Sequence, residues 1–222
     1  MFASDRQVTD LFDAMVDQRP RESKPIAKER VHKSDPDKVV IGDIKLLTGD
    51  VCMKPVAGTD CKRLYFCNAL PNFECGVCFD HPLDHYPLMM IFEMGRQVGI
   101  AVSHEFYGVP LKGHINIVDA LSFEFKRFLE LDKPVYIVCA DSAVQERKGL
   151  LRREMNLAFI QEGVHCASGS GNVSIVSHAL YKRMRAASRS GIIGRPVAGA
   201  HAIPTNVDLI DPPDRVAACE RL

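Results

Sequence analysis

The chain has 222 residues, with 28 basic and 28 acidic side chains and 46% hydrophobic residues. This length suits one domain with extended ends, and the apolar content is enough for a core of ordinary size. A net charge of zero argues against binding to nucleic acids or anionic membranes through overall charge. No run approaches the roughly 20 apolar residues that span a bilayer, and the first 20 residues lack the apolar core of a secretory signal. We therefore expect a soluble, cytoplasmic protein whose eight cysteines are free thiols.

Residues 1–36 are predicted to form an N-terminal arm. Within it, residues 4–17 have apolar residues at helical spacing, at Val8, Leu11, Phe12 and Met15. Residues 19–38 are dense in charge and proline, which favours a linker. The alternative is an ordered strand that begins near Val31.

Residues 39–47 and 63–70 are predicted to be strands, and a loop over 71–85 leads to one long helix over 87–107. Pro87 suits the first helical position and Gly108 the residue after the helix. Residues 88–92 are apolar all round, which predicts a helix wrapped by other elements. Gly95 and Gly99 are one turn apart and predict a close approach of the helix to a sheet.

Four strand-like runs follow the helix, over 115–125, 134–141, 150–161 and 164–170, and a second helix is predicted over 177–189. Consecutive strands without intervening helices favour an antiparallel sheet. The expected fold class is α+β, a hotdog fold in which the sheet wraps around one long central helix. This domain would span 37–190, followed by an irregular tail over 191–222 that is rich in Gly, Pro and Ala.

One motif joins the loop to the long helix. Residues 79–87 read Phe-Asp-His-Pro-Leu-Asp-His-Tyr-Pro, and residues 90–97 read Met-Ile-Phe-Glu-Met-Gly-Arg-Gln. Together they resemble the signature of the A-factor biosynthesis (AfsA-like) hotdog family, approximately F-D-H-P-x-D-H-x-P-G-M-x-x-x-E-x-x-R-Q. Residues 31–33, 38–47 and 104–114 also look like this family, so the resemblance covers about residues 30–190.

The resemblance implies an acyltransferase of secondary metabolism that needs no cofactor. The family condenses a β-ketoacyl group, held as a thioester on an acyl carrier protein, with a hydroxyl of dihydroxyacetone phosphate, leading to a γ-butyrolactone or butenolide. Family relatives also release polyketide chains. Two departures stand out: Leu88 replaces the family's glycine, and the chain has room for one hotdog repeat where the namesake members have two. A homodimer is therefore expected.

Glu93 is the main catalytic candidate, as a general base. It lies in an otherwise apolar helical run, where desolvation of a lone carboxylate would raise its pKa towards that of a useful base. Arg96 and Gln97 share its helical face and are expected to hold it or to bind a substrate oxygen. The alternative is a buried Glu–Arg pair with no catalytic duty.

Two histidines and two aspartates precede the helix within six residues: Asp80, His81, Asp84 and His85. Backbone amides at a helix N-terminus favour developing negative charge, so a thioester carbonyl placed there would gain stabilisation of its oxyanion. A nearby histidine could orient the substrate or move a proton. Asp84, Pro87 and Leu88 are expected to contact the substrate, with helix capping by Asp84 as the alternative.

Two other features have less specific interpretations. Cys75, Cys78, His81 and His85 have a spacing that zinc could use, but the family motif already accounts for both histidines, so no metal is expected. Residues 163–207 contain no acidic residue, and Lys182, Arg183 and Arg185 make the second helix basic. This helix is a candidate for docking an acidic carrier protein or attracting a phosphorylated substrate, and a solvated surface is the alternative.

Two other functions remain open at this point. The chain could be a hotdog thioesterase or hydroxyacyl dehydratase, or a non-catalytic dimer that binds an acyl thioester. Product analysis separates the enzymes, since they yield a free acid, an enoyl thioester, or a new ester or butenolide.

Overall fold

The computed structural model describes residues 12–13, 23–47, 63–74, 78–79, 81–147 and 149–193. The chain divides into two compact units, Met1–His178 and Ala179–Leu222. In the first unit, neighbouring strands pair antiparallel in one six-stranded sheet, in the order β1-β2-β4-β5-β6-β3. The strands are β1 (Lys45–Leu46), β2 (Leu64–Asn68), β3 (His114–Phe125), β4 (Val135–Arg147), β5 (Leu150–Gln161) and β6 (Val164–Ser177).

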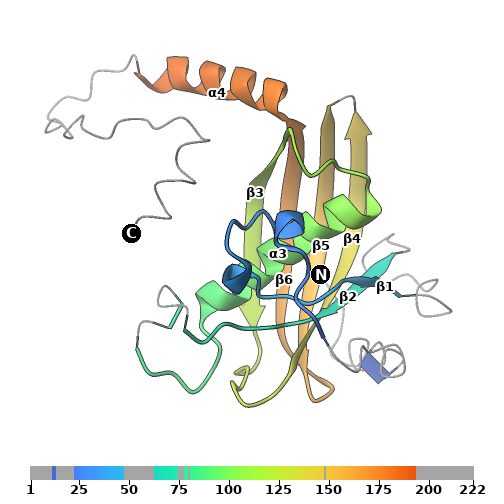
Figure 1. Ribbon diagram of the computed structural model, residues 1–222, viewed down its shortest axis with the longest axis vertical. Coiled ribbons are helices and arrows are strands. Elements are labelled where there is room, and N and C mark those ends of the chain that lie inside the picture. The colour runs from blue at the N-terminus through green and yellow to red at the C-terminus, as the bar shows by residue number, and fades with distance from the viewer. Residues whose placement is uncertain are drawn as a thin grey trace, which may run out of the picture. The chain divides into compact units, whose positions relative to one another are not determined.

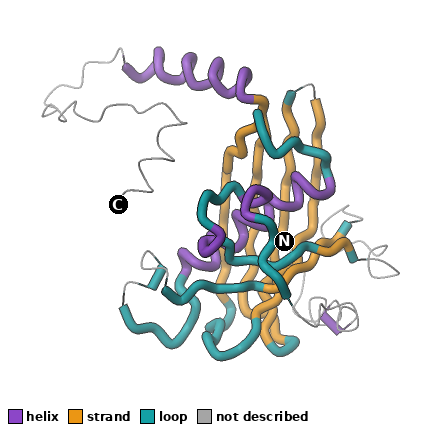
Figure 2. Tube along the Cα trace, viewed as in Figure 1, coloured by secondary structure: helices purple, strands orange, loops and turns teal. Residues whose placement is uncertain are grey.

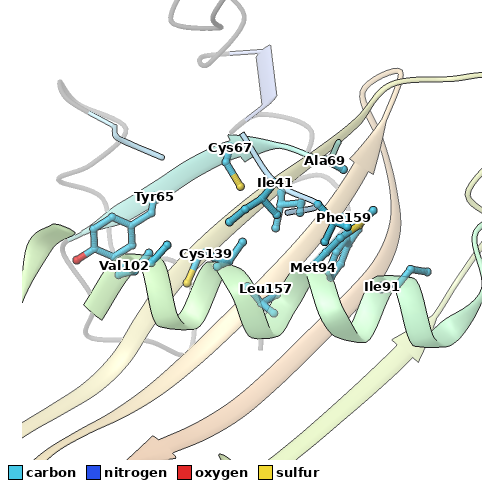
Figure 3. Packing of buried hydrophobic residues seen from close by; sticks show 14 of the residues in the cluster. Ile41, Tyr65, Cys67, Ala69, Ile91, Met94, Val102, Cys139, Leu157 and Phe159 are labelled. Atoms are coloured by element: carbon cyan, nitrogen blue, oxygen red, sulfur yellow. The ribbon is translucent and has the colours of Figure 1, made fainter. Parts of the chain in front are cut away.

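The long helix α3 (Leu88–Phe106) lies across one face of this sheet (Figure 1). Its apolar side chains pack with those of β2, β4 and β5 in one core cluster that includes Met94, Val98 and Val102. Figure 3 shows Tyr65 and Cys67 of β2 on one side of the helix and Cys139, Leu157 and Phe159 of β4 and β5 near it. The expected α+β hotdog arrangement, a sheet around one buried helix, is therefore confirmed.

Glycines allow α3 to approach the sheet closely, as predicted for Gly95 and Gly99. A Cβ atom on Gly95 would lie 2.8 Å from Leu157 Cδ1, and one on Gly99 would lie 3.0 Å from Met155 Cε. The sheet has matching glycines on β6: Gly169 lies beneath the ring of Phe123, whose Cε1 would be 2.8 Å from an added Cβ. Side chains of β3 and β5 thus pack over the glycines of β6 and contact α3. A side chain at any of these glycines would push α3 away from the sheet.

Residues 23–47 cover the side of α3 that points away from the sheet (Figure 2). They contain two 3₁₀ turns, η2 (Lys28–Val31) and η3 (Pro36–Lys38), and contribute Ile26, Val31 and residues 39–41 to the main core. The boundary expected near residue 36, between an arm and the domain, therefore does not coincide with a change in packing. Of the helix expected over 4–17, Phe12 and Asp13 are described, and both are helical.

A second, smaller core lies on the opposite face of the sheet. Phe12 packs there with Leu64, Phe66 and Ala158, and its ring centroid is 5.4 Å from that of Tyr136. Phe12 is buried, so at this position the N-terminal segment contacts the apolar half of the outer face of the sheet.

Two strands are longer than the sequence predicted. β4 continues to Arg147 through a register shift between Asp141 and Ala143, and β6 continues to Ser177 although residues 168–172 are serine, glycine and asparagine. Residues 39–47, expected to be a strand, are only intermittently paired, through Ile41–Ala69, Gly42 and β1. This is because Val40 N–H donates to the Gln97 side chain instead of to a strand.

The second helix is α4 (His178–Ile193), one residue later at its start than predicted and four residues longer at its end. No helix in the described ranges has both the length and the apolarity that crossing a bilayer requires.

Candidate functional site

The first turn of α3 is open to solvent. Leu88 and Met89 are each 53% exposed, contrary to the expectation that residues 88–92 are enclosed on all sides. Pro87 precedes the turn, and no side chain caps it. The amides of Leu88 and Met89 donate no hydrogen bond within the described residues, whereas those of Met90 and Ile91 bond to Pro87 O. An uncapped start of a 19-residue helix has free N–H donors and a positive end of the helix dipole.

A pocket of about 400 Å³ adjoins this turn. Its walls come from two segments far apart in the sequence, His85–Ile91 at the start of α3 and Phe125–Leu129 after β3. Most of the lining is apolar, with Leu88, Ile91, Phe125 and Phe128 among the residues. Lys126 and Arg127 add two cations at the same place. An apolar pocket with a few polar groups at one end is typical of a small-molecule site.

His85 lines this pocket and is held by an acidic partner. Its Nδ1 lies 2.7 Å from Asp84 Oδ1, and its ring centroid lies 4.8 Å from that of Phe128. The hydrogen bond from His85 holds the pKa of Asp84 below its ordinary value. When Nδ1–H donates to Asp84, Nε2 is left as the acceptor of the neutral imidazole. Asp84 therefore orients a histidine and does not cap the helix.

The other predicted residues of this loop lie apart from the pocket or outside the described residues. His81 is exposed and lines a different, shallow hollow with Phe73, Phe79 and Leu131. Asp80 lies outside the described residues. So does Cys75, one of the four residues in the metal alternative.

Glu93 is bound on three sides. Arg96 donates to it through Nε and Nη2 at 2.7 and 2.8 Å, Lys33 Nζ lies 2.9 Å from Oε1, and Gln97 Nε2 donates at 2.8 Å. Burial raises the pKa of Glu93, but the hydrogen bonds from Arg96, Lys33 and Gln97 outweigh it and lower the pKa to about 2. The prediction of a raised pKa was wrong because it considered desolvation without the opposing hydrogen bonds, of which those from Arg96 and then Lys33 lower the pKa most.

Gln97 extends this cluster to the N-terminal segment. Its amide donates to Lys38 O at 2.8 Å and its oxygen accepts from Val40 N–H at 3.0 Å. In the last turn of α3, His104 contacts His32, with 2.9 Å between the two Nε2 atoms. Glu105 pairs with Arg30. The polar face of α3 thus fastens residues 30–40, and we refer to Lys33, Glu93, Arg96 and Gln97 as the clamp.

The clamp and the pocket lie on different sides of α3. At 100° per residue, Glu93 is about 200° around the helix from Ile91, which lines the pocket. The described contacts of Glu93 include neither histidine of the loop. Within one chain, the structure brings together His85, Asp84, Pro87 and Leu88, and separately Glu93, Arg96 and Gln97.

Several residues that line the pocket or contact the polar face of α3 were not predicted from the sequence. The run Phe125-Lys126-Arg127-Phe128 at the end of a strand alternates apolar and basic side chains, a signal that could have marked it as pocket lining. Lys33 and His32 stand beside each other in a charged segment and have no distinguishing spacing. Lys182, Arg183 and Arg185 are exposed on α4, and their role in docking a carrier protein stays a prediction.

A long helix enclosed by an antiparallel sheet defines a hotdog domain. The family of the A-factor biosynthesis hotdog domain matches residues 16–177, and the chain belongs to this family. No curated protein matches the chain.

Among solved structures, the chain is similar to a hotdog-like protein from Thermanaerovibrio acidaminovorans, with 15% identity over 48% of this chain and 73% of that one and a TM-score of 0.38. It is also similar to a mutant thioesterase from Pseudomonas aeruginosa, with 10% identity over 60% and 81% and a TM-score of 0.40. A third is a Streptococcus mutans protein bound to acetyl-CoA, with 8% identity over 61% and 90% and a TM-score of 0.38.

Proposed function

We propose that this chain transfers a β-ketoacyl or polyketide acyl group from the thioester of an acyl carrier protein to a hydroxyl of a small phosphorylated acceptor, such as dihydroxyacetone phosphate. The observation that carries this proposal is the pocket beside the uncapped start of α3, with the His85–Asp84 pair at its rim. Membership of the A-factor biosynthesis hotdog family supports the same reaction. The product would lead to a butenolide or γ-butyrolactone.

Each part of the site supplies one requirement of acyl transfer. The acyl chain lies against Leu88, Ile91, Phe125 and Phe128, whose apolar surface it would cover. The thioester carbonyl is directed at the amides of Leu88 and Met89, which would stabilise the oxyanion that forms there. Lys126 and Arg127 attract the phosphate of the acceptor.

Proton transfer is assigned to His85. Its Nε2 takes the proton of the attacking hydroxyl, the hydroxyl oxygen bonds to the carbonyl carbon, and the proton then goes to the departing thiolate. A carboxylate with a pKa near 2 accepts protons poorly at neutral pH, so Glu93 anchors the N-terminal segment instead. This replaces the general-base role that the sequence suggested for Glu93.

The test is mass spectrometry of the products after mixing the protein with a β-ketoacyl thioester on a carrier mimic, with and without dihydroxyacetone phosphate. We expect a phosphorylated ester only when both substrates are present. His85→Gln should lower its rate about 100-fold or more, within the range for loss of a general base. The matched control is His114→Gln, which changes an imidazole remote from the pocket and should leave the rate unchanged.

Other products would contradict the proposal in distinguishable ways. Free acid formed without the phosphate would indicate a thioesterase, and an enoyl thioester would indicate a dehydratase. Tight acyl binding without turnover would indicate a non-catalytic acyl-binding dimer.

A further inference from the structure

The sheet has a polar outer face opposite α3. Along β3, β5 and β6, side chains alternate between the two faces. Leu121, Met155 and Leu157 point towards α3, since they contact the positions of its glycines or those of β6. Their neighbours therefore point away from it. Ser122, Ser170 and Asn156 stand opposite one another in adjacent strands on this outer face.

A groove of about 520 Å³ runs over these residues. Its polar lining consists of short side chains from four adjacent strands: Ser122, Ser142, Glu154, Asn156, Ser170 and Asn172. The volume falls in the range of small-molecule sites, about 300–1,000 Å³. The pocket of the proposed acyl transfer lies at the other face of the sheet, so the groove is a separate feature of the molecule.

Asn156 is the unusual residue of this groove. The residue is 4% exposed, and its amide makes no hydrogen bond with the described residues, although the amide atoms are not closed off from solvent. The buried amides of Gln97 and Gln161, by contrast, are engaged: Gln97 bonds to Val40 N and Lys38 O, and Gln161 bonds to the backbone of Glu130 and Lys133. The amide thus faces the groove with its hydrogen-bonding capacity unused by the protein, and a ligand there would replace the water that meets it.

We propose that this groove binds an uncharged polyhydroxylated ligand, of the size of a mono- or disaccharide or a cyclic polyol. Serine hydroxyls and asparagine amides both donate and accept, which matches hydroxyl groups that do the same. Glu154 adds an acceptor for paired hydroxyls. The lining contains no lysine or arginine for a phosphate and no aromatic side chain. Its two large apolar residues, Leu121 and Met155, direct their side chains to the other face, so an acyl chain would find little surface.

The adjoining hollow continues the same chemistry. It shares Glu154 and Asn172 with the groove and adds Gln145, Asp119 and Arg152. Asp119 stands at a register shift of β3 and accepts a hydrogen bond from Ser174 Oγ at 2.5 Å. A second sugar ring would reach this hollow, whose lining has two arginines, Arg152 and Arg153, and two carboxylates, Asp119 and Glu154, and therefore no net positive charge for an anion.

The test is saturation-transfer NMR of the intact protein with four probes: glucose, N-acetylglucosamine, maltose and myo-inositol. We expect transfer to at least one of them, with affinity lowered tenfold or more in Asn156→Ala. Because the amide has no partner in the unliganded protein, this variant should keep or raise the thermal midpoint of unfolding. A structural asparagine would not show that combination.

The matched control is Asn116→Ala. Asn116 Nδ2 is also buried without a partner, but Asn116 lies on β3 opposite Ile175, on the α3 side of the sheet. Its removal should leave probe binding unchanged. Absence of transfer from all four probes would overturn the proposal. So would unchanged binding in Asn156→Ala, or a lower thermal midpoint in that variant, which would mean that the amide is already bonded within the protein.

Discussion

Glu93 illustrates how neighbouring side chains decide the role of a buried carboxylate. Its partners Arg96 and Lys33 come from α3 and from residues 30–40, and the bidentate contact with Arg96 keeps Glu93 ionised. The side chain then stabilises the folded state as the anion, with a folded pKa below its unfolded value. That contribution is present above about pH 4.5 and is lost as the pH falls towards 2.

Glu93→Gln should therefore lower stability more than catalysis. The substitution leaves Lys33 and Arg96 without their anion, and we expect a loss of about 1.5–3 kcal/mol in the free energy of unfolding, as for hydrogen bonds to charged groups. The turnover number should change by less than about threefold. Urea unfolding and steady-state kinetics at pH 7 measure both. A hundredfold fall in turnover with unchanged stability would return the general-base role to Glu93.

His32 is a second residue whose state depends on its neighbours. Its backbone has a positive φ of 55°, unusual for a non-glycine residue. His104 Nδ1 donates to Val109 O, so its Nε2 accepts the proton of His32 Nε2. Desolvation, followed by the charges of His104 and Arg96, lowers the pKa of His32 to about 4. The folded protein thus favours the neutral imidazole.

This lowered pKa predicts a loss of stability in mild acid. Between about pH 6.5 and 4 the unfolded chain binds a proton at His32 that the folded chain does not, so the free energy of unfolding falls as the pH falls through this window. His32→Gln should flatten the curve there, measured by urea unfolding at stepwise pH, while His114→Gln should not. A curve of unchanged slope in His32→Gln would contradict the assignment.

At the scale of elements, a buried ion pair joins α3 to the strands. Arg153 on β5 bonds Asp141 on β4 through Nη2 at 2.6 Å, and its Nη1 donates to Gly99 O and Ser103 Oγ on α3. Tyr107 OH donates to the other oxygen of Asp141 at 2.6 Å. Both ions are almost fully buried. The pair fixes where the last turns of α3 lie on the sheet.

Removing one member of this pair should cost more than removing both. Asp141→Leu alone leaves a buried guanidinium uncompensated and is expected to cost about 3–5 kcal/mol, as is Arg153→Met alone. The double variant should recover a large part of that loss, because neither charge remains to be desolvated. Chemical denaturation of the three variants forms a double-mutant cycle. Additive losses would show that the two side chains stabilise the fold independently.

At the scale of the whole molecule, β3 lies at an edge of the sheet. It pairs with β6 on one side, and the described residues provide no strand for its other side. Val118 and Phe125 on β3 are 40% and 47% exposed. A long edge strand with exposed apolar side chains is suited to pairing with another chain. We therefore propose that two chains associate through β3. Phe125 also lines the acyl pocket, so this contact would lie beside the pocket.

Val118→Glu should dissociate this dimer. A two-fold axis that crosses β3 at right angles near Val118 would bring the two new carboxylates near each other in an apolar contact, and like charges across an interface are unfavourable. Sedimentation velocity should give twice the monomer mass for the unaltered protein and the monomer mass for the variant. The control Val164→Glu alters an equally exposed valine at the start of β6 and should remain dimeric. A monomeric unaltered protein would contradict the proposal.

The sequence by itself determined the class of the fold and singled out the loop and helix start that form one wall of the pocket. Pro87 and Gly108 bound the helix, with Gly108 at a φ of 64°, and the unbroken succession of strands after it required an antiparallel sheet. His85 and the start of α3 were found because they are adjacent along the chain. Local patterns are sufficient where the interacting residues are neighbours in sequence.

Tertiary structure decided the rest, because the deciding contacts join distant residues. Residues 168–172 of β6 have low strand propensity, yet they pair because large side chains of β3 and β5 cover the glycines and meet α3. Lys33, 60 residues earlier in the chain, is one of the groups that lower the pKa of Glu93, and the pocket is completed by residues 125–129. Neither a propensity nor a motif predicts which remote cation will lie beside a carboxylate, and a cation at that place lowers the pKa of the carboxylate.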